Sequence, residues 1–289
     1  MKLQRAWCLI AGVLLAALHL AFAQFPGGGS GTEGDPYLVS SAEHLNAIRT
    51  PYLGSLGSPL YYRQTADIDL SGFLNWEPIG SSTIPAYVNY AGASNRISNL
   101  TITRSSESGV GLFGKLAGSI QDLALDSGSV TANSWGGSLV GFLDGGTIQG
   151  CRSTVSVSGS SSIGGLVGWN EGGALQDSCY RTGSVEATGS YAGGLVGYNG
   201  GTVDGCYAAG SVSAGTFPGG LVGWAGGGAS VAGSYWDTTV SGQAASAGSV
   251  SGGILTSNMM QRATFSGWDF STQWQLYESN SYPYLEALA

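Results

Sequence analysis

The stretch Gly-Gly-Leu-Val-Gly-Trp-Asn at residues 164–170 returns as Gly-Gly-Leu-Val-Gly-Tyr-Asn at residues 193–199. Related segments occupy residues 111–114, 138–141 and 220–223. The leucines of the five segments are Leu112, Leu139, Leu166, Leu195 and Leu221. Their nearly constant period of about 27 residues predicts a stack of one repeated unit, in which each unit buries its apolar face against its neighbours.

Each repeat holds three short strand-like segments bounded by Gly or Ser-Gly turns. The first carries the Leu-Val-Gly signature. The second is centred on Ile120, Ile148, Leu175, Val203 and Val231, and the third on Ser129-Val130, Val155–Val157, Ser184-Val185, Ser211-Val212 and Thr239-Val240. No helical period is sustained in such short segments. The pattern predicts an all-β fold, a parallel β-helix or solenoid with coils about 4.8 Å apart, and the usual crossover preference makes it right-handed.

The repeats, at residues 109–242, are flanked by dissimilar segments. Residues 24–35 form a Gly-rich leader, 36–108 an N-terminal cap with the first coils, and 243–289 a C-terminal cap. Residues 40–49 predict a capping helix with a Ser40–Glu43 capping box. Residues 256–264 predict a second one with Thr256 as its N-cap. We expect the aromatic tail at residues 268–285 to seal the C-terminal end of the stack.

Residues 1–23 have the features of a secretory signal peptide. Lys2 and Arg5 precede an apolar core, and Ala21-Phe22-Ala23 forms a small-x-small cleavage site. The apolar run is shorter than the ~20 residues of a membrane span. We therefore expect a secreted, extracellular or cell-surface protein, with the periplasm as an alternative.

The chain without this peptide is strongly acidic, with 8 Lys and Arg against 18 Asp and Glu. This balance argues against nucleic acid and anionic membranes as partners. The candidate partners that the sequence leaves are a polysaccharide or a host or surface protein.

The signatures at residues 164–170 and 193–199 are each followed by Asp-x-Cys-Tyr, at 177–180 and 204–207. Together these segments resemble the GLUG motif of bacterial surface proteins, including filamentous-haemagglutinin-like adhesins and segments of IgA-cleaving metallopeptidases. The resemblance implies a β-solenoid that serves as a scaffold on a surface. The zinc-protease motif His-Glu-x-x-His of those peptidases is absent from this sequence.

Candidate catalytic groups are few. His44 is the only histidine after the signal peptide, and we expect it to be a solvated or capping residue, so the sequence predicts no metal site, no cofactor and no catalytic triad. Asp122, Asp177 and Asp204 occupy similar repeat positions, where adjacent coils could bring two carboxylates about 5 Å apart, as in retaining glycosidases. Because aspartate commonly stabilises turns, we favour a structural role for them. A glycan hydrolase remains the less favoured alternative.

Three cysteines, Cys151, Cys179 and Cys206, recur at close to the repeat period. We expect them at equivalent positions of consecutive coils, as a ladder of buried thiols. A disulfide between two neighbours is the alternative.

An aromatic residue directly follows the second glycine in four repeats: Phe142, Trp169, Tyr198 and Trp224. Stacked coils should align these residues in a ladder that either binds sugar rings or a protein or covers the corner glycines. A regular Ser/Thr face would indicate ice binding, but Glu186 interrupts the series Thr131, Ser156 and Ser213. The sequence therefore favours a non-catalytic surface scaffold, with a carbohydrate-binding module as the main alternative.

Overall fold

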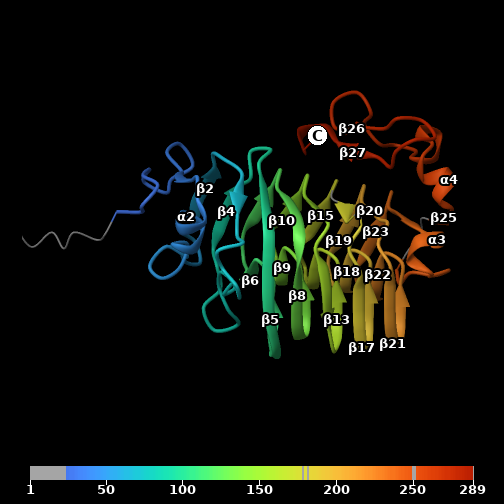
Figure 1. The fold of residues 1–289 in the computed structure, drawn as a ribbon, viewed down its shortest axis with the longest axis horizontal. Helices are drawn as coiled ribbons and strands as arrows, with labels where there is room; N and C mark the ends of the chain where they lie inside the picture. Colours follow the sequence, from blue (N-terminus) through green and yellow to red (C-terminus); the bar gives the residue numbers. More distant parts are fainter. Residues whose placement is uncertain (1–23, 178, 181, 249–251, 289) are drawn as a thin grey trace, which may run out of the picture.

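The computed structural model describes residues 24–177, 179–180, 182–248 and 252–288; the predicted signal peptide lies outside them. The chain winds through successive coils, and strands of one coil pair in parallel with strands of the next (Figure 1). The result is a β-solenoid of about seven turns with about 28 residues per turn. The predicted parallel β-helix is confirmed, while its right-handed sense stays a prediction.

Three sheets make up the faces of the coil among the described residues. The sheet of the signature segments contains β6 (Phe113–Leu116), β9 (Val140–Asp144), β14 (Val167–Glu171), β18 (Val196–Asn199) and β22 (Val222–Ala225). A second sheet contains β1 (Tyr37–Val39), β2 (Leu60–Gln64), β4 (Val88–Ala91), β7 (Ser119–Gln121), β10 (Thr147–Gln149), β15 (Ala174–Gln176), β19 (Thr202–Asp204) and β23 (Ser230–Ala232).

The third sheet holds the longest strands, which extend from one side of the rod in Figure 1. It contains β3 (Ile68–Asp69), β5 (Arg96–Val110), β8 (Ala124–Gly137), β11 (Arg152–Ser153), β12 (Ser156–Gly159), β13 (Ser161–Gly164), β16 (Cys179–Tyr180), β17 (Val185–Gly193), β20 (Tyr207–Ala208), β21 (Val212–Gly219), β24 (Tyr235–Asp237) and β25 (Gly253–Ile254). Except for Thr239-Val240 in the last repeat, the three predicted segments of each repeat thus correspond to the three sheets.

The signature is a core-forming segment. Both apolar residues of every copy are buried, for example Leu166 and Val167. The second glycine is required by close backbone packing: a β-carbon on Gly197 would lie 2.4 Å from the carbonyl carbon of Ser162. Gly168 meets the backbone of Trp135 in the same way. The signature strand therefore packs directly on the backbone of the third-sheet strand of the preceding coil, β13 for Gly197 and β8 for Gly168.

The N-terminal cap contains the predicted helix in a shorter form. Helix α2 (Ala42–Asn46) begins one residue later than expected, because Ser41, not Ser40, is its N-cap and accepts a hydrogen bond from the His44 amide. The expected Ser40–Glu43 capping box is therefore wrong. Leu45 is buried, and the helix covers the first coil.

At the other end, the expected strand around Thr239-Val240 is wrong. These residues form helix α3 (Thr238–Ser241), whose N-cap Asp237 accepts hydrogen bonds from both of their amides. Helix α4 (Thr256–Met259) follows, and a 3₁₀ turn η1 covers Arg262–Thr264. Thr256 is not an N-cap; its hydroxyl donates to Asp237 Oδ2.

The aromatic tail does not seal the end of the stack. It carries the antiparallel pair β26 (Trp274–Gln275) and β27 (Tyr284–Leu285) and a final 3₁₀ turn η2 (Glu286–Leu288), and it runs back along the side of the rod (Figure 1). It packs on Ala124 and Tyr207, and the Tyr207 hydroxyl donates to the Pro283 carbonyl at 2.6 Å. The tail follows this path because these side chains on the outside of the coil need an apolar cover.

Candidate functional site

The predicted aromatic ladder exists. Register pairs Phe142 with Trp169, Trp169 with Tyr198, and Tyr198 with Trp224 on β9, β14, β18 and β22. The Trp169 and Tyr198 rings stack with centroids 3.7 Å apart, and those of Phe142 and Trp169 are parallel at 6.3 Å. At its N-terminal end the ladder continues as Lys115, whose Nζ lies 5.0 Å from the Phe142 ring centroid.

A second aromatic column lies beside the first, and sequence reasoning missed it. It consists of Trp135, Tyr191 and Phe217 at the ends of β8, β17 and β21. Trp135 packs edge-on against Phe142 and Trp169, at centroid distances of 5.5 and 5.7 Å. Tyr191 and Phe217 contact Trp224 at 5.4 and 5.5 Å. We call the two columns together, seven residues in all, the aromatic face.

Backbone conformation places this second column. Trp135, Tyr191 and Phe217 have φ values of 54°, 65° and 55°, a left-handed conformation that bulky residues adopt only where the surroundings require it. A sequence signal was available, because each residue precedes its ladder partner by seven positions, as Trp135 precedes Phe142. That signal is visible only once the ladder itself has been recognised.

The aromatic face is partly exposed. Phe217 is 54% and Trp224 38% exposed, and the other five rings are half-buried. Some of them also cover glycines: the Tyr198 hydroxyl lies 2.6 Å from where a β-carbon of Gly226 would be. The face therefore shields backbone and presents aromatic surface at the same time.

One hollow of about 220 Å³ opens at the N-terminal end of the aromatic face. Its lining is Ser82, Gly109, Lys115, Trp135 and Phe142. Gly109 occupies the register position of Trp135 one coil earlier, so its missing side chain leaves the hollow open. Lys115 forms an ion pair with Asp144 at 2.8 Å, which offsets the positive charge beside the hollow.

The three aspartates do not all lie in one corner column. Register places Asp122 and Asp177 in one corner column but two coils apart, with Gly150 between them. Asp204 pairs with Gln176 and lies one position before that column. The three residues thus lie near one repeat position, as expected, and Asp204 is offset by one residue because the interval from Asp177 to Asp204 is one residue shorter than the coil that they span.

Each of these corner aspartates is fitted into the structure of the turn. Asp122 and Asp177 have left-handed φ values of 52° and 48°. Their Oδ1 atoms lie 2.5 and 2.7 Å from where a β-carbon of Gly150 and Gly205 would be, one coil further on. Partial burial raises the pKa of the Asp122 carboxyl. These contacts fit the structural role that the sequence favours for them.

The cysteines are not at equivalent positions. Cys179 pairs with Arg152 and Tyr207, one position after Cys151 and Cys206. The expected straight ladder is therefore wrong, because the step from Cys151 to Cys179 is one residue longer than the step that pairs Ile148 with Leu175 in the same coil. Cys151 and Cys206 are buried, and the side chain of Cys179 lies outside the described atoms.

The expected hydroxyl series is shifted as well. Thr131 pairs with Ser158, which pairs with Glu186, and Ser156 belongs to the neighbouring column with Ser129. The exposed Glu186 still interrupts the column. His44 lies in helix α2, where the ring nitrogen Nδ1 is 3.3 Å from the Ser40 hydroxyl, a capping contact.

Metal clusters and membrane-spanning helices are absent from the described part of the chain. Among these residues, no group of three or more His, Cys, Asp or Glu side chains could hold a metal ion. None of the described helices has both the length and the apolar character needed to cross a membrane.

The comparisons with known proteins match the repeats and the fold. A family model, the GLUG motif, matches residues 188–213. Over 125 residues the chain is 33% identical to a protein named "Putative Gly-rich membrane protein" from Evansella cellulosilytica, covering 41% of this chain and 14% of that protein. Over 142 residues it is 37% identical to "Halomucin" from Haloquadratum walsbyi, covering 44% of this chain and 2% of halomucin. The chain thus spans a small part of either relative.

A solved structure shares the whole architecture. It is the crystal structure of "a putative immunoglobulin A1 protease from Bacteroides ovatus", with a TM-score of 0.64 and 18% sequence identity over 90% of this chain and 94% of that one. At this identity the similarity shows the fold alone. The chain therefore carries the GLUG motif on a β-solenoid, as its signatures indicate.

Proposed function

We propose that this chain is a non-catalytic, secreted or surface-held scaffold that adheres to other extracellular components through its aromatic face. The observation that carries the proposal is the face itself: seven aromatic side chains from successive coils form one partly exposed surface. Aromatic surfaces of this kind are enriched at binding sites. The membrane-protein and mucin names of two relatives support a surface location.

The proposal also holds that the corner aspartates have no catalytic role. Asp122 and Asp177 are separated by a whole coil and pack over glycines of the next one. Paired carboxylates of a retaining glycosidase lie about 5 Å apart, whereas Asp122 and Asp177 are two coils apart.

Adhesion can be tested with the purified full chain, fluorescently labelled, on bacterial cells, host epithelial cells and extracted extracellular matrix. The variant Phe217→Ala/Trp224→Ala removes the two most exposed rings of the face. We expect it to weaken binding at least about tenfold, since aromatic residues dominate interface energies. Tyr277→Ala is the matched control, because Tyr277 is 66% exposed and lies in the tail, between β26 and β27.

Equal binding by the wild-type chain and the Phe217→Ala/Trp224→Ala variant would contradict the proposal. So would release of reducing sugar from any polysaccharide that disappears in Asp177→Asn, because that result would establish a hydrolase.

A second candidate function is carbohydrate binding at the same face. It is favoured by the hollow between Trp135, Phe142 and Lys115, which is bounded by aromatic rings and open to solvent. Trp135→Ala should then remove binding of a soluble saccharide, whereas Tyr277→Ala should not.

A further inference from the structure

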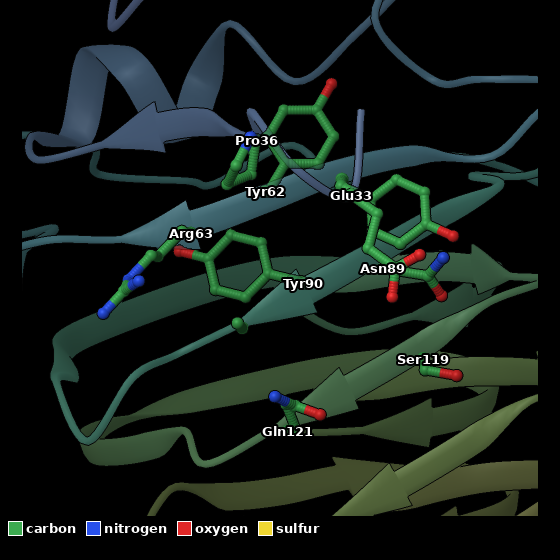
Figure 2. A pocket seen from close by; sticks show the side chains of 10 residues that line it. Glu33, Pro36, Tyr62, Arg63, Asn89, Tyr90, Ser119 and Gln121 are labelled. Atoms are coloured by element: carbon green, nitrogen blue, oxygen red, sulfur yellow. The ribbon is translucent and has the colours of Figure 1, made fainter. Parts of the chain in front are cut away.

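A second depression lies away from the aromatic face, on the outside of the sheet that contains β2, β4, β7 and β10. It comprises two adjoining hollows of about 350 and 260 Å³ that share Gln121. The first lies over β2, β4 and β7, as Figure 2 shows, and the second continues to β10. The two hollows meet at Gln121 and together border β2, β4, β7 and β10. We call this depression the amide groove.

Both ends of the described chain contribute walls to the amide groove. Glu33 and Pro36, from the leader and the residue after it, border the first hollow. Thr272, Gln273, Leu285 and Ala287 of the tail border the second. Two segments from opposite ends of the sequence therefore meet the same sheet face, and they leave its middle uncovered.

The floor carries planar amides at successive strands. Gln121 pairs with Gln149, so these two amides lie one strand spacing of about 4.8 Å apart. Asn89 pairs with Ser119 in the neighbouring column, two positions before the Gln121 column, whose residue on β4 is Ala91. In the described part of the chain the side-chain amides of Asn89, Gln121 and Gln149 make no hydrogen bond to other protein groups. Each amide offers both donors and an acceptor, the combination that a chain of hydroxyl groups can satisfy.

An aromatic ring and balanced charges complete the lining. Tyr61 is half-buried beside Asn89 on the neighbouring strand, where its ring can contact the apolar face of a sugar. Glu33 and Arg63 contribute one charge of each sign to the first hollow. Asp122 lies in the second, in a chain of net charge −8, so an anionic ligand would be repelled.

We propose that the amide groove binds a strand of neutral polysaccharide, laid along the solenoid axis with its hydroxyl groups on Asn89, Gln121 and Gln149. A pyranose residue is about as long as one strand spacing, so two successive sugars can meet Gln121 and Gln149, which occupy equivalent positions of successive coils. This site goes beyond the proposed function, because it lies on a different sheet from the aromatic face and does not need it.

The test is isothermal titration of the full chain with maltohexaose, cellohexaose, xylohexaose and mannohexaose. At least one hexaose should bind, and Gln121→Ala/Gln149→Ala should weaken its binding about tenfold or more, as the loss of two ligand hydrogen bonds implies. Thr202→Ala/Ser230→Ala is the matched control, because both residues lie exposed on the outside of the same sheet beyond the two hollows. Thermal melting of each variant verifies that it is folded.

Binding of none of the four hexaoses at millimolar concentration would overturn the inference. So would equal binding by the wild-type chain and the Gln121→Ala/Gln149→Ala variant. Loss of hexaose binding in Trp135→Ala but not in the glutamine variant would place the saccharide at the aromatic face instead. Loss of cell adhesion in Phe217→Ala/Trp224→Ala with hexaose binding retained would leave the amide groove as a separate site.

Discussion

The N-terminal coils and the regular coils solve the same packing problem with different side chains. One inward column of the second sheet runs Tyr37, Tyr62, Tyr90, Ile120, Ile148, Leu175, Val203 and Val231. It begins with tyrosines and ends with valines. The difference teaches that the backbone repeat extends further than the sequence repeat, because large rings in the first coils replace the aliphatic ladder without changing the strand pairing.

The tyrosines impose a polar requirement that the aliphatic residues lack. The Tyr62 hydroxyl donates to the Tyr52 carbonyl at 2.5 Å, and the Tyr90 hydroxyl donates to Gln64 Oε1 at 3.0 Å. The buried Gln64 in turn donates to the carbonyls of Ala66 and Arg96. Burial raises the pKa of both tyrosine hydroxyls, which keeps them protonated as donors. The N-terminal core is thus joined by hydrogen bonds, and the regular core by apolar contact.

The largest loss of stability should come from substitution of Gly197, because the regular coils pack closely against this glycine. In Gly197→Val the β-carbon would collide with the backbone of Ser162 and Ile163, at 2.4 and 2.6 Å. Because backbone cannot move aside cheaply, we expect a loss of about 3–5 kcal/mol in unfolding free energy, measured by urea denaturation. Gly227→Ala is the control, since nothing lies within 4 Å of its added carbon. Equal stability of the two variants would show that close packing does not explain the signature.

A smaller loss is expected in the N-terminal network. Gln64→Leu leaves the buried Tyr90 hydroxyl and two partly buried carbonyls without the hydrogen bonds from Gln64. Unpaired buried groups cost about 1–3 kcal/mol each, partly recovered by relaxation, so a net loss of about 2–3 kcal/mol should appear in the same assay. Addition of Tyr90→Phe should recover part of it, and a double variant no more stable than Gln64→Leu would exclude the proposed coupling.

In the regular coils, a core substitution in the same sheet should reduce the unfolding free energy only slightly. Ile148→Val removes one methylene from a fully buried aliphatic column, and such changes cost about 0.5–1.5 kcal/mol. A loss as large as that of Gln64→Leu would mean that the two regions do not differ in the way described.

The smallest effect on stability concerns Asp122, at the corner where the N-terminal and the regular coils meet. This effect should depend on pH. Asp122 has its pKa raised by partial burial, so its ionised form is disfavoured in the folded state. The wild-type chain should therefore lose stability relative to Asp122→Asn as pH rises past the ordinary pKa of an aspartate, by less than about 1 kcal/mol because the group is partly exposed. Melting curves at pH 3 and pH 7 test the sign. A wild-type chain that gains stability relative to Asp122→Asn between pH 3 and pH 7 would contradict this sign.

Some of the candidate site could be predicted and some could not. The ladder from Phe142 to Trp224 could be predicted from the repeat period, because in four repeats an aromatic residue directly follows the second glycine of the buried signature. Trp135, Tyr191 and Phe217 were missed because their column depends on left-handed backbone that no single residue type marks. The cysteine and aspartate columns were misjudged because coils differ in length by one residue, and a shift of one position moves a side chain to another column.

The sequence by itself determined the parallel β-solenoid, the composition of its regular core and the position of the aromatic ladder. These features follow from local spacing that is repeated in every coil. Only the tertiary structure decided that the tail returns along the side, that leader and tail flank the amide groove, and that a second aromatic column completes the face. Such features depend on contacts between residues far apart in the chain, which leave no period in the sequence.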